Sequence, residues 1–226
     1  MALDKSFKVN SRRENCRNQS QPNVKKFGID DINQHFNDSI NKIEMLSDMY
    51  SNTNNEALLR AQVVFLESAF DFFMHEITKL CLCEMFENSR NKTQRYNKLS
   101  INLEQMHKLI DNYDKNDLFV DYINSNYETV SMLSYESVSN QCKLLGLDFG
   151  KTAKECFPNK IREKSIEDLK SFFNNLYSMR NCIAHQSSRS HIDATIQDIT
   201  VEFVNNSFDT LKNIVKNIIE QIEKVE

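Results

Sequence analysis

The sequence predicts an all-α fold: an antiparallel helical bundle with two long core helices and several shorter helices. Only three glycines and two prolines occur in 226 residues, which favours long helices and few tight turns. Apolar residues recur in steps of three and four along most of the chain, as they do on the buried face of a helix. The length suits one domain with a sizeable core.

The N-terminal segment differs in charge from the rest of the chain. Residues 1–26 carry seven Lys or Arg and two acidic residues, a net charge of +5, whereas the other 200 carry 21 basic and 30 acidic residues, a net charge of −9. Because the segment is also poor in apolar residues, we predict a disordered arm over residues 1–27 and a single helical domain over 28–226. The charge is compatible with a contact to phosphate backbones and equally with a solvated tail.

The first predicted helix begins at Asp30 or Asp31, whose side chains can cap it, and ends before a polar connector at 51–55. The next helix has the clearest pattern, with seven apolar residues in steps of four and three: Leu59, Val63, Leu66, Phe70, Phe73, Ile77 and Leu80. Phe65, Ala69 and Phe72 widen this face, which predicts a central helix covered by several neighbours.

A polar column lies beside that apolar stripe. Glu67, Asp71 and His75 follow one another at four-residue steps and therefore line up on the helix. A metal site would need more ligands than the sequence offers, so we discount one here. Two interpretations remain: a solvated face, or a face from which Glu67 or Asp71 supplies a counter-charge to Arg180 across the bundle.

The middle third, residues 88–159, has weaker patterns. We expect a polar loop at 88–97 and short helices at 102–110, 116–123 and 135–145, with Gly146 stopping the last of them. Gly150 and Pro158 bracket a stretch that we expect to be irregular. This region contains no phosphate loop, glycine-rich dinucleotide turn or metal-ligand cluster.

The C-terminal third contains two further helices. We expect the first to begin at Ser165, a good N-cap residue, and to bury its apolar stripe: Ile166, Leu169, Phe173, Leu176 and Ile183. A polar loop at 187–190 follows. Thr195 and Asp198 offer a capping pair for the final helix, whose apolar residues alternate in steps of three and four from Val201 to Ile222.

One short polar group interrupts the first of these stripes. Arg180 occupies the next core-facing position after Leu176, and a guanidinium on a buried face needs a partner because it cannot shed its charge. Asn181 and His185 are four residues apart and share one side of the helix, about 100° from Arg180. This cluster indicates either a functional site or a buried polar network.

The string Arg180-Asn181-Cys182-Ile183-Ala184-His185 resembles the motif of the HEPN superfamily of RNases and nucleic-acid-associated domains. The family motif is an Arg, usually a polar residue, a few more residues and a His, near the C-terminal end of a helical bundle. The helix at 58–73 also looks like the family's first long core helix. The similarity is greatest to the branch found beside microbial defence and toxin–antitoxin genes, which includes the RiboL-PSP-HEPN and MAE-like families.

Two function classes follow. The first is a metal-independent endoribonuclease, in which His185 transfers protons, Arg180 stabilises the phosphorane charge and Asn181 holds the imidazole or the phosphate. Attack by the RNA 2′-hydroxyl would give a 2′,3′-cyclic phosphate and a 5′-hydroxyl. The resemblance implies a homodimer in which two copies of the motif meet. It also implies a toxin or anti-phage role, with an antitoxin or regulatory protein as a partner. The second class is a non-catalytic module that binds a nucleotide, RNA or a protein.

The remaining composition limits other functions. The six cysteines show no paired spacing typical of zinc sites, so we expect reduced, partly buried thiols and neither a metal nor a cofactor. No apolar run is long enough to cross a membrane, and the N-terminus lacks a signal core, so we expect a cytoplasmic protein. His191 is a reserve candidate for the catalytic His, although a loop or cap role suits it better.

Overall fold

The computed structural model describes residues 26–111, 115–127, 129–186 and 197–224. Within these ranges the regular elements are helices, and no strand occurs, which confirms the all-α class. The elements in chain order are α2 (Ile29–Thr53), α3 (Glu56–Phe86), the 3-10 segment η1 (Tyr96–Lys98), α4 (Leu103–Asp111), α5 (Lys115–Tyr127), α6 (Tyr135–Leu145), α7 (Phe149–Cys156), α8 (Arg162–Gln186) and α9 (Val201–Glu223).

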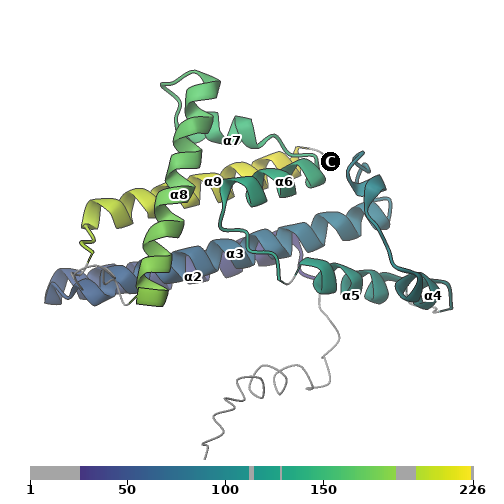
Figure 1. Cartoon of the computed structure of the whole chain (residues 1–226), viewed down its shortest axis with the longest axis horizontal. Coiled ribbons are helices and arrows are strands. Elements are labelled where there is room, and N and C mark those ends of the chain that lie inside the picture. The colour runs from purple at the N-terminus through teal and green to yellow at the C-terminus, as the bar shows by residue number, and fades with distance from the viewer. Residues whose placement is uncertain (1–25, 112–114, 128, 187–196, 225–226) are drawn as a thin grey trace, which may run out of the picture.

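Helix α3 is the central element of the bundle and packs against α2, α8 and α9 (Figure 1). Helices α2 and α3 form an antiparallel hairpin, α9 runs alongside α3, and α8 crosses both α3 and α9 at a steep angle. Helices α4 and α5 lie toward the C-terminal end of α3. The crossing of α3 and α8 places the polar column of α3 next to the Arg180 motif.

The apolar stripe of α3 is buried along its whole length, as its periodicity predicts. Phe36 of α2 and Phe173 of α8 contact it through Phe73 and Phe70, with ring centroids 5.7 and 5.9 Å apart. The prediction that Phe65 and Phe72 widen the buried face is wrong, because their exposed fractions are 52% and 45%. Neighbouring helices cover the stripe itself but leave this flank of α3 open.

Three predicted helix starts are also wrong. Helix α2 begins at Ile29 with Gly28 as its N-cap residue, and Asp31 lies inside the first turn, where its Oδ2 accepts from the Gly28 N–H at 3.3 Å. Helix α8 begins at Arg162, and Ser165 is buried inside it, where its hydroxyl donates to the carbonyls of Phe157 and Ile161 at 3.1 Å. Helix α9 is capped by Thr200, whose hydroxyl accepts from the Phe203 N–H at 3.1 Å. Thr195, one member of the predicted capping pair, lies outside the described residues.

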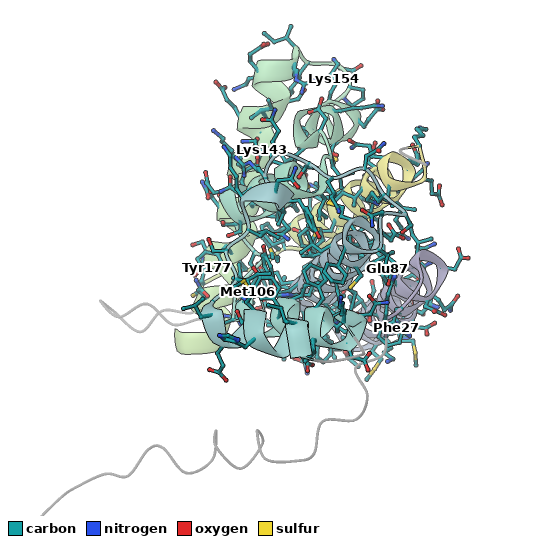
Figure 2. All side chains as sticks on the ribbon, turned by 90° about the vertical axis from the view of Figure 1, so that its right-hand side faces the viewer. Phe27, Glu87, Met106, Lys143, Lys154 and Tyr177 are labelled. Atoms are coloured by element: carbon teal, nitrogen blue, oxygen red, sulfur yellow. The ribbon has the colours of Figure 1, made fainter. Side chains whose placement is uncertain are left out.

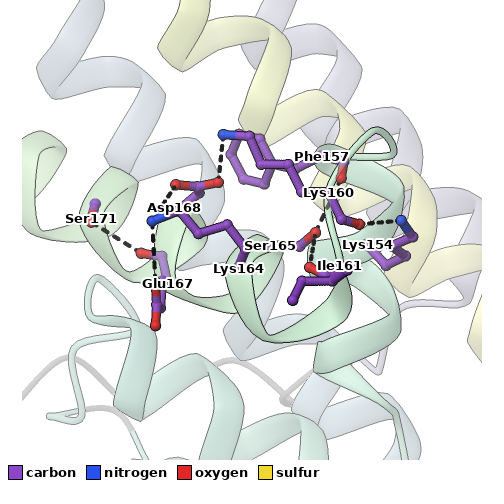
Figure 3. A network of polar contacts seen from close by, with 9 residues as sticks. All are labelled: Lys154, Phe157, Lys160, Ile161, Lys164, Ser165, Glu167, Asp168 and Ser171. Atoms are coloured by element: carbon purple, nitrogen blue, oxygen red, sulfur yellow. Dashed lines mark hydrogen bonds and ion pairs between the residues drawn. The ribbon is translucent and has the colours of Figure 1, made fainter.

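The stretch expected to be irregular contains α7. Asp148 caps this helix by accepting from the Lys151 N–H, and Gly150 lies against Arg162, whose guanidinium would be 2.5 Å from an added Cβ. Figure 3 shows the turn that follows, where the Lys154 ammonium donates to the carbonyl of Lys160. The same ammonium also donates to the carbonyl of Pro158 at 2.6 Å. These contacts connect α7 to the start of α8.

The helix at 135–145 and its glycine stop are confirmed. Ser134 caps α6, and Gly146 ends it with a φ of 79°, in the left-handed region that glycine tolerates best. Among the described helices, none is long and apolar enough to cross a membrane.

Candidate functional site

The candidate site lies where the C-terminal half of α8 passes over the middle of α3. Buried Phe173 and Leu176 pack on the core, with Phe173 against Phe70 of α3, and this packing sets the rotation of α8. Arg180 follows one turn after Leu176, so the same rotation turns it toward α3. Arg180 is therefore positioned by its apolar neighbours on α8.

Glu67 is the acidic residue that meets Arg180. Its Oε2 lies 3.6 Å from Arg180 Nε, and the exposed fraction of the Glu67 side chain is 3%, against 34% for Arg180. Arg180 Nη1 also donates to Asn181 Oδ1 at 3.1 Å. The guanidinium is thus held on its inner side by Glu67 and on its flank by Asn181, while part of it remains accessible to solvent.

The protonation of Glu67 is unusual. The pKa of its carboxyl is raised to about 8: burial is the main cause, Arg180 acts in the opposite direction, and the nearby Asp71 adds a smaller upward effect. Both carboxyl oxygens are buried, and neither has a hydrogen-bond partner. Because a pKa near 8 leaves most of this carboxyl neutral at pH 7, Arg180 keeps its positive charge largely uncompensated.

Asp71 has a different role from Glu67. Its Oδ1 accepts a hydrogen bond of 2.7 Å from the backbone N–H of Met132, and its Oδ2 lies 3.7 Å from His75 Nε2. Asp71 therefore ties the segment between α5 and α6 to α3, beside the site. The sequence pattern had left Glu67 and Asp71 as equal candidates for the Arg180 contact, and the structure brings Glu67 to it.

His185 belongs to the same helix as Arg180 and Asn181, in the last turn of α8. The described part of this residue is its backbone, which places it about 7.5 Å along the helix axis from Arg180. Cα positions five residues apart on a helix differ by about 140° in direction. His191 lies outside the described residues.

Two contributors to this region have no distinctive sequence pattern. The Met132 N–H belongs to a connecting segment, and a backbone donor leaves no trace in the residue type. Tyr177 precedes Arg180 by three residues and is 45% exposed; Figure 2 places it at the edge of the molecule. Its position outside the apolar stripe was visible in the sequence, but its exposure depends on how the neighbouring helices pack.

Three buried thiols contribute little reactivity. Cys81, Cys83 and Cys142 are buried and free, and burial raises their pKa values to about 12, 11 and 12. A thiol with such a pKa is a poor nucleophile and a poor metal ligand near pH 7. In the part of the chain that the structure describes, no group of three His, Cys, Asp or Glu side chains is arranged to hold a metal ion.

A family model described as RiboL-PSP-HEPN matches residues 28–224, from just before α2 to the end of α9. The chain belongs to the RiboL-PSP-HEPN family. This confirms the resemblance inferred from the Arg180 motif and its helical setting. Neither a comparison with curated proteins nor one with solved structures gave a match.

Membership of the RiboL-PSP-HEPN family has two consequences. HEPN domains are all-α, in agreement with the helices described above, and they are often RNases. The match begins at residue 28, so residues 1–27, the predicted arm, lie outside it. The family match therefore supports a nuclease-like or other HEPN module.

Proposed function

We propose that the protein is a metal-independent endoribonuclease that acts in the cytoplasm as a toxin or anti-phage defence effector. The observation that carries the proposal is the contact between Arg180 and buried Glu67 at the α3–α8 crossing. It provides a positioned and accessible cation on the helix that also carries His185, the one residue of the motif that titrates near neutral pH.

The proposed reaction uses the 2′-hydroxyl of the RNA as the nucleophile. His185 accepts the 2′-hydroxyl proton, the 2′-oxygen forms a bond to phosphorus, and the bond from phosphorus to the 5′-oxygen breaks. A protonated His donates to the departing 5′-oxygen. The products are a 2′,3′-cyclic phosphate and a 5′-hydroxyl.

Arg180 and Asn181 supply the electrostatic part of this mechanism. The guanidinium can donate to two phosphate oxygens at once, which matches the geometry of a phosphorane. The amide oxygen of Asn181 is engaged by Arg180 Nη1, so its amide N–H groups face other acceptors, either the phosphate or the imidazole.

A homodimer is part of the proposal because one His does not easily serve the attacking and the leaving oxygen at the same time. A two-fold axis near Arg180 would bring two motifs to one cleft. Exposed Tyr177, three residues before Arg180 on α8, lies on a surface suited to such a contact. Phe65 precedes Glu67 by two residues, about 200° around α3, so an interface formed through it would not join the motifs.

The alternative is a non-catalytic HEPN module that binds a nucleotide, RNA or a protein such as an antitoxin. One observation favours it: the contact between Glu67 and Arg180 links two core helices, so the polar group could serve packing alone. Substitution of Arg180 distinguishes the two functions. If Arg180 is purely structural, the variant is less stable than the wild type, and neither protein cleaves RNA.

The test is incubation of the purified chain with end-labelled RNA in the presence of EDTA. We expect cleavage by the wild type, at least about 100-fold slower cleavage by His185→Ala and Arg180→Ala, and no change for His107→Ala, an exposed His on α4 that serves as the matched control. Treatment with polynucleotide kinase identifies the cyclic phosphate ends. Full activity of His185→Ala would exclude the mechanism, and RNA binding by a wild type that does not cleave would favour the binding module.

A further inference from the structure

The Glu67 carboxyl is the feature of the site that the cleavage chemistry does not use. It lies almost fully buried between α3 and α8, and neither of its oxygens forms a hydrogen bond with the residues that the structure describes. A buried carboxylate normally gathers several donors, because an ionised group without them is costly to keep out of water. Glu67 faces a guanidinium with many N–H groups and still forms no hydrogen bond with it.

We propose that Glu67 is a positioning residue that acts as a neutral carboxyl, holding the Arg180 guanidinium in place without cancelling its charge, so that the charge is kept for a phosphate group. The proposal rests on the proposed function for the identity of the substrate, RNA. The coupling between Glu67 and the binding of a phosphodiester can be measured whether or not the protein cleaves RNA.

The contact geometry supports a neutral Glu67. A buried carboxylate and an Arg commonly form a bidentate pair with N–O distances of about 2.7–2.9 Å. Here the Nε–Oε2 distance is 3.6 Å, and Arg180 Nη1 donates to the Asn181 amide instead of to Glu67. The guanidinium is therefore located by Glu67 but remains available to a stronger acceptor on its solvent side.

The surrounding charges also favour protonation of Glu67. Among the described residues, the charged groups that face it are Arg180 from α8 and Asp71 from one turn along α3. Asp71 is more exposed, and its Oδ1 accepts a hydrogen bond from the Met132 N–H. Of two neighbouring carboxyls, the more buried one without donors takes the proton first.

This arrangement couples anion binding to a proton. A phosphate that binds on the solvent side of Arg180 meets an uncompensated guanidinium as long as Glu67 is neutral. Once Glu67 loses its proton, near pH 8, its negative charge competes with the phosphate for Arg180. Affinity for a phosphodiester should therefore fall as the pH rises through about 8.

The variants that test the proposal are Glu67→Gln and Glu67→Ala, compared with Glu76→Gln as the matched control. Gln reproduces the shape of a neutral carboxyl, whereas Ala removes it. Glu76 is a second largely buried Glu on α3, and it pairs with Lys79 at 2.7 Å. Binding of a short oligodeoxynucleotide, which has no 2′-hydroxyl to react, is measured by fluorescence anisotropy from pH 6.5 to 9.

We expect Glu67→Gln to bind within about twofold of the wild type at pH 6.5 and to keep that affinity at pH 9, where the wild type weakens by about tenfold. Glu67→Ala should bind more weakly at every pH because Arg180 loses its support, and Glu76→Gln should follow the wild type. Loss of binding at pH 6.5 by a folded Glu67→Gln would show that a carboxylate charge is required and would overturn the proposal.

A measurement on the wild type covers the case in which a Glu67 variant does not fold. Carbon-13 NMR of labelled Glu carboxyls, assigned through the lost signal in one variant or through neighbouring methyl groups, reports the titration of Glu67 directly. A titration near pH 8 supports the proposal, and one below pH 6 overturns it. Absence of RNA cleavage together with the expected binding pattern would reject the proposed function and leave the role of Glu67 standing.

Discussion

Two neighbouring faces of α3 hold buried residues of different chemistry. One side is the continuous apolar stripe from Leu59 to Leu80, each residue of which packs against neighbouring helices. About 100° around the helix from Leu66, Glu67 is equally buried and has no hydrogen-bond partner. Burial stabilises the first side through apolar contact and imposes a desolvation cost on the second.

The comparison shows that burial alone does not identify the functional part of this helix. A buried apolar residue adds to the free energy of unfolding, whereas a buried carboxyl without donors reduces it unless the group becomes neutral. Retaining Glu67 next to Arg180 therefore costs stability, and the accessible charge of Arg180 is what the arrangement provides in return.

The largest effect expected is on the apolar side. Phe73→Ala should lower the free energy of unfolding by about 3–5 kcal/mol, because it removes a fully buried ring that packs on Phe36. The adjacent residue gives a matched control: Phe72→Ala should cost less than about 1.5 kcal/mol, since that ring is 45% exposed. Urea unfolding of both variants measures the difference. Equal losses of unfolding free energy in the two variants would contradict the observation that Phe72 lies on an open flank of α3.

The next effect is on the polar side. Glu67→Leu should match or exceed the stability of the wild type at pH 8, by up to about 3 kcal/mol, and should bind and cleave RNA poorly. An unfolded Glu titrates near 4.5 and the folded Glu67 near 8, so wild-type stability falls as the pH rises between these values and levels off above about 8. Below pH 4.5 the carboxyl is protonated in both states.

That pH dependence is checked by urea unfolding of the wild type and Glu67→Leu at pH 4, 6 and 8. The difference between the two proteins should grow with pH in favour of the variant. A difference that stays constant from pH 4 to pH 8 would mean that Glu67 ionises in the folded protein as readily as in the unfolded chain.

A smaller loss is expected from Asp71→Ala, about 1–3 kcal/mol, because it leaves the Met132 N–H without its acceptor. Asp71→Asn is the matched control, since its amide oxygen can still accept that bond. Hydrogen exchange of the Met132 amide, followed by mass spectrometry, should accelerate in the Ala variant and change little in the Asn variant. Similar exchange rates in the Ala and Asn variants would show that Asp71 does not tie the α5–α6 segment to α3.

The smallest effect on stability is expected from deleting residues 1–25, a change that leaves both sides of α3 intact. The deletion removes six basic and two acidic residues, a net charge of +4, and keeps the Lys26–Glu87 ion pair at 2.9 Å. Unfolding should be unchanged. If the segment contacts RNA, affinity should drop and the dependence of log affinity on log salt should become shallower. Identical salt titrations of the full chain and the deletion variant would indicate that the segment is a solvated tail without RNA contacts.

Local patterns accounted for much of the fold. The α3 stripe was predictable because helix periodicity alone places those seven residues on one face. The stop of α6 at Gly146 was predictable because a left-handed residue is needed there. The start of α8 was not, since Ser165 has the residue type of a cap but its hydroxyl finds the carbonyls of Phe157 and Ile161 inside the helix.

For the site, the sequence by itself determined that Arg180 falls on a core-facing position and that two acidic residues line up on α3. It could not decide between Glu67 and Asp71, because both follow the same periodicity. That choice belongs to the tertiary structure: the packing of Phe173 on Phe70 sets where α8 crosses α3, and at that crossing Arg180 reaches Glu67. The raised pKa of Glu67 has the same origin, since desolvation depends on the helices that cover the group and not on the residues beside it in the chain.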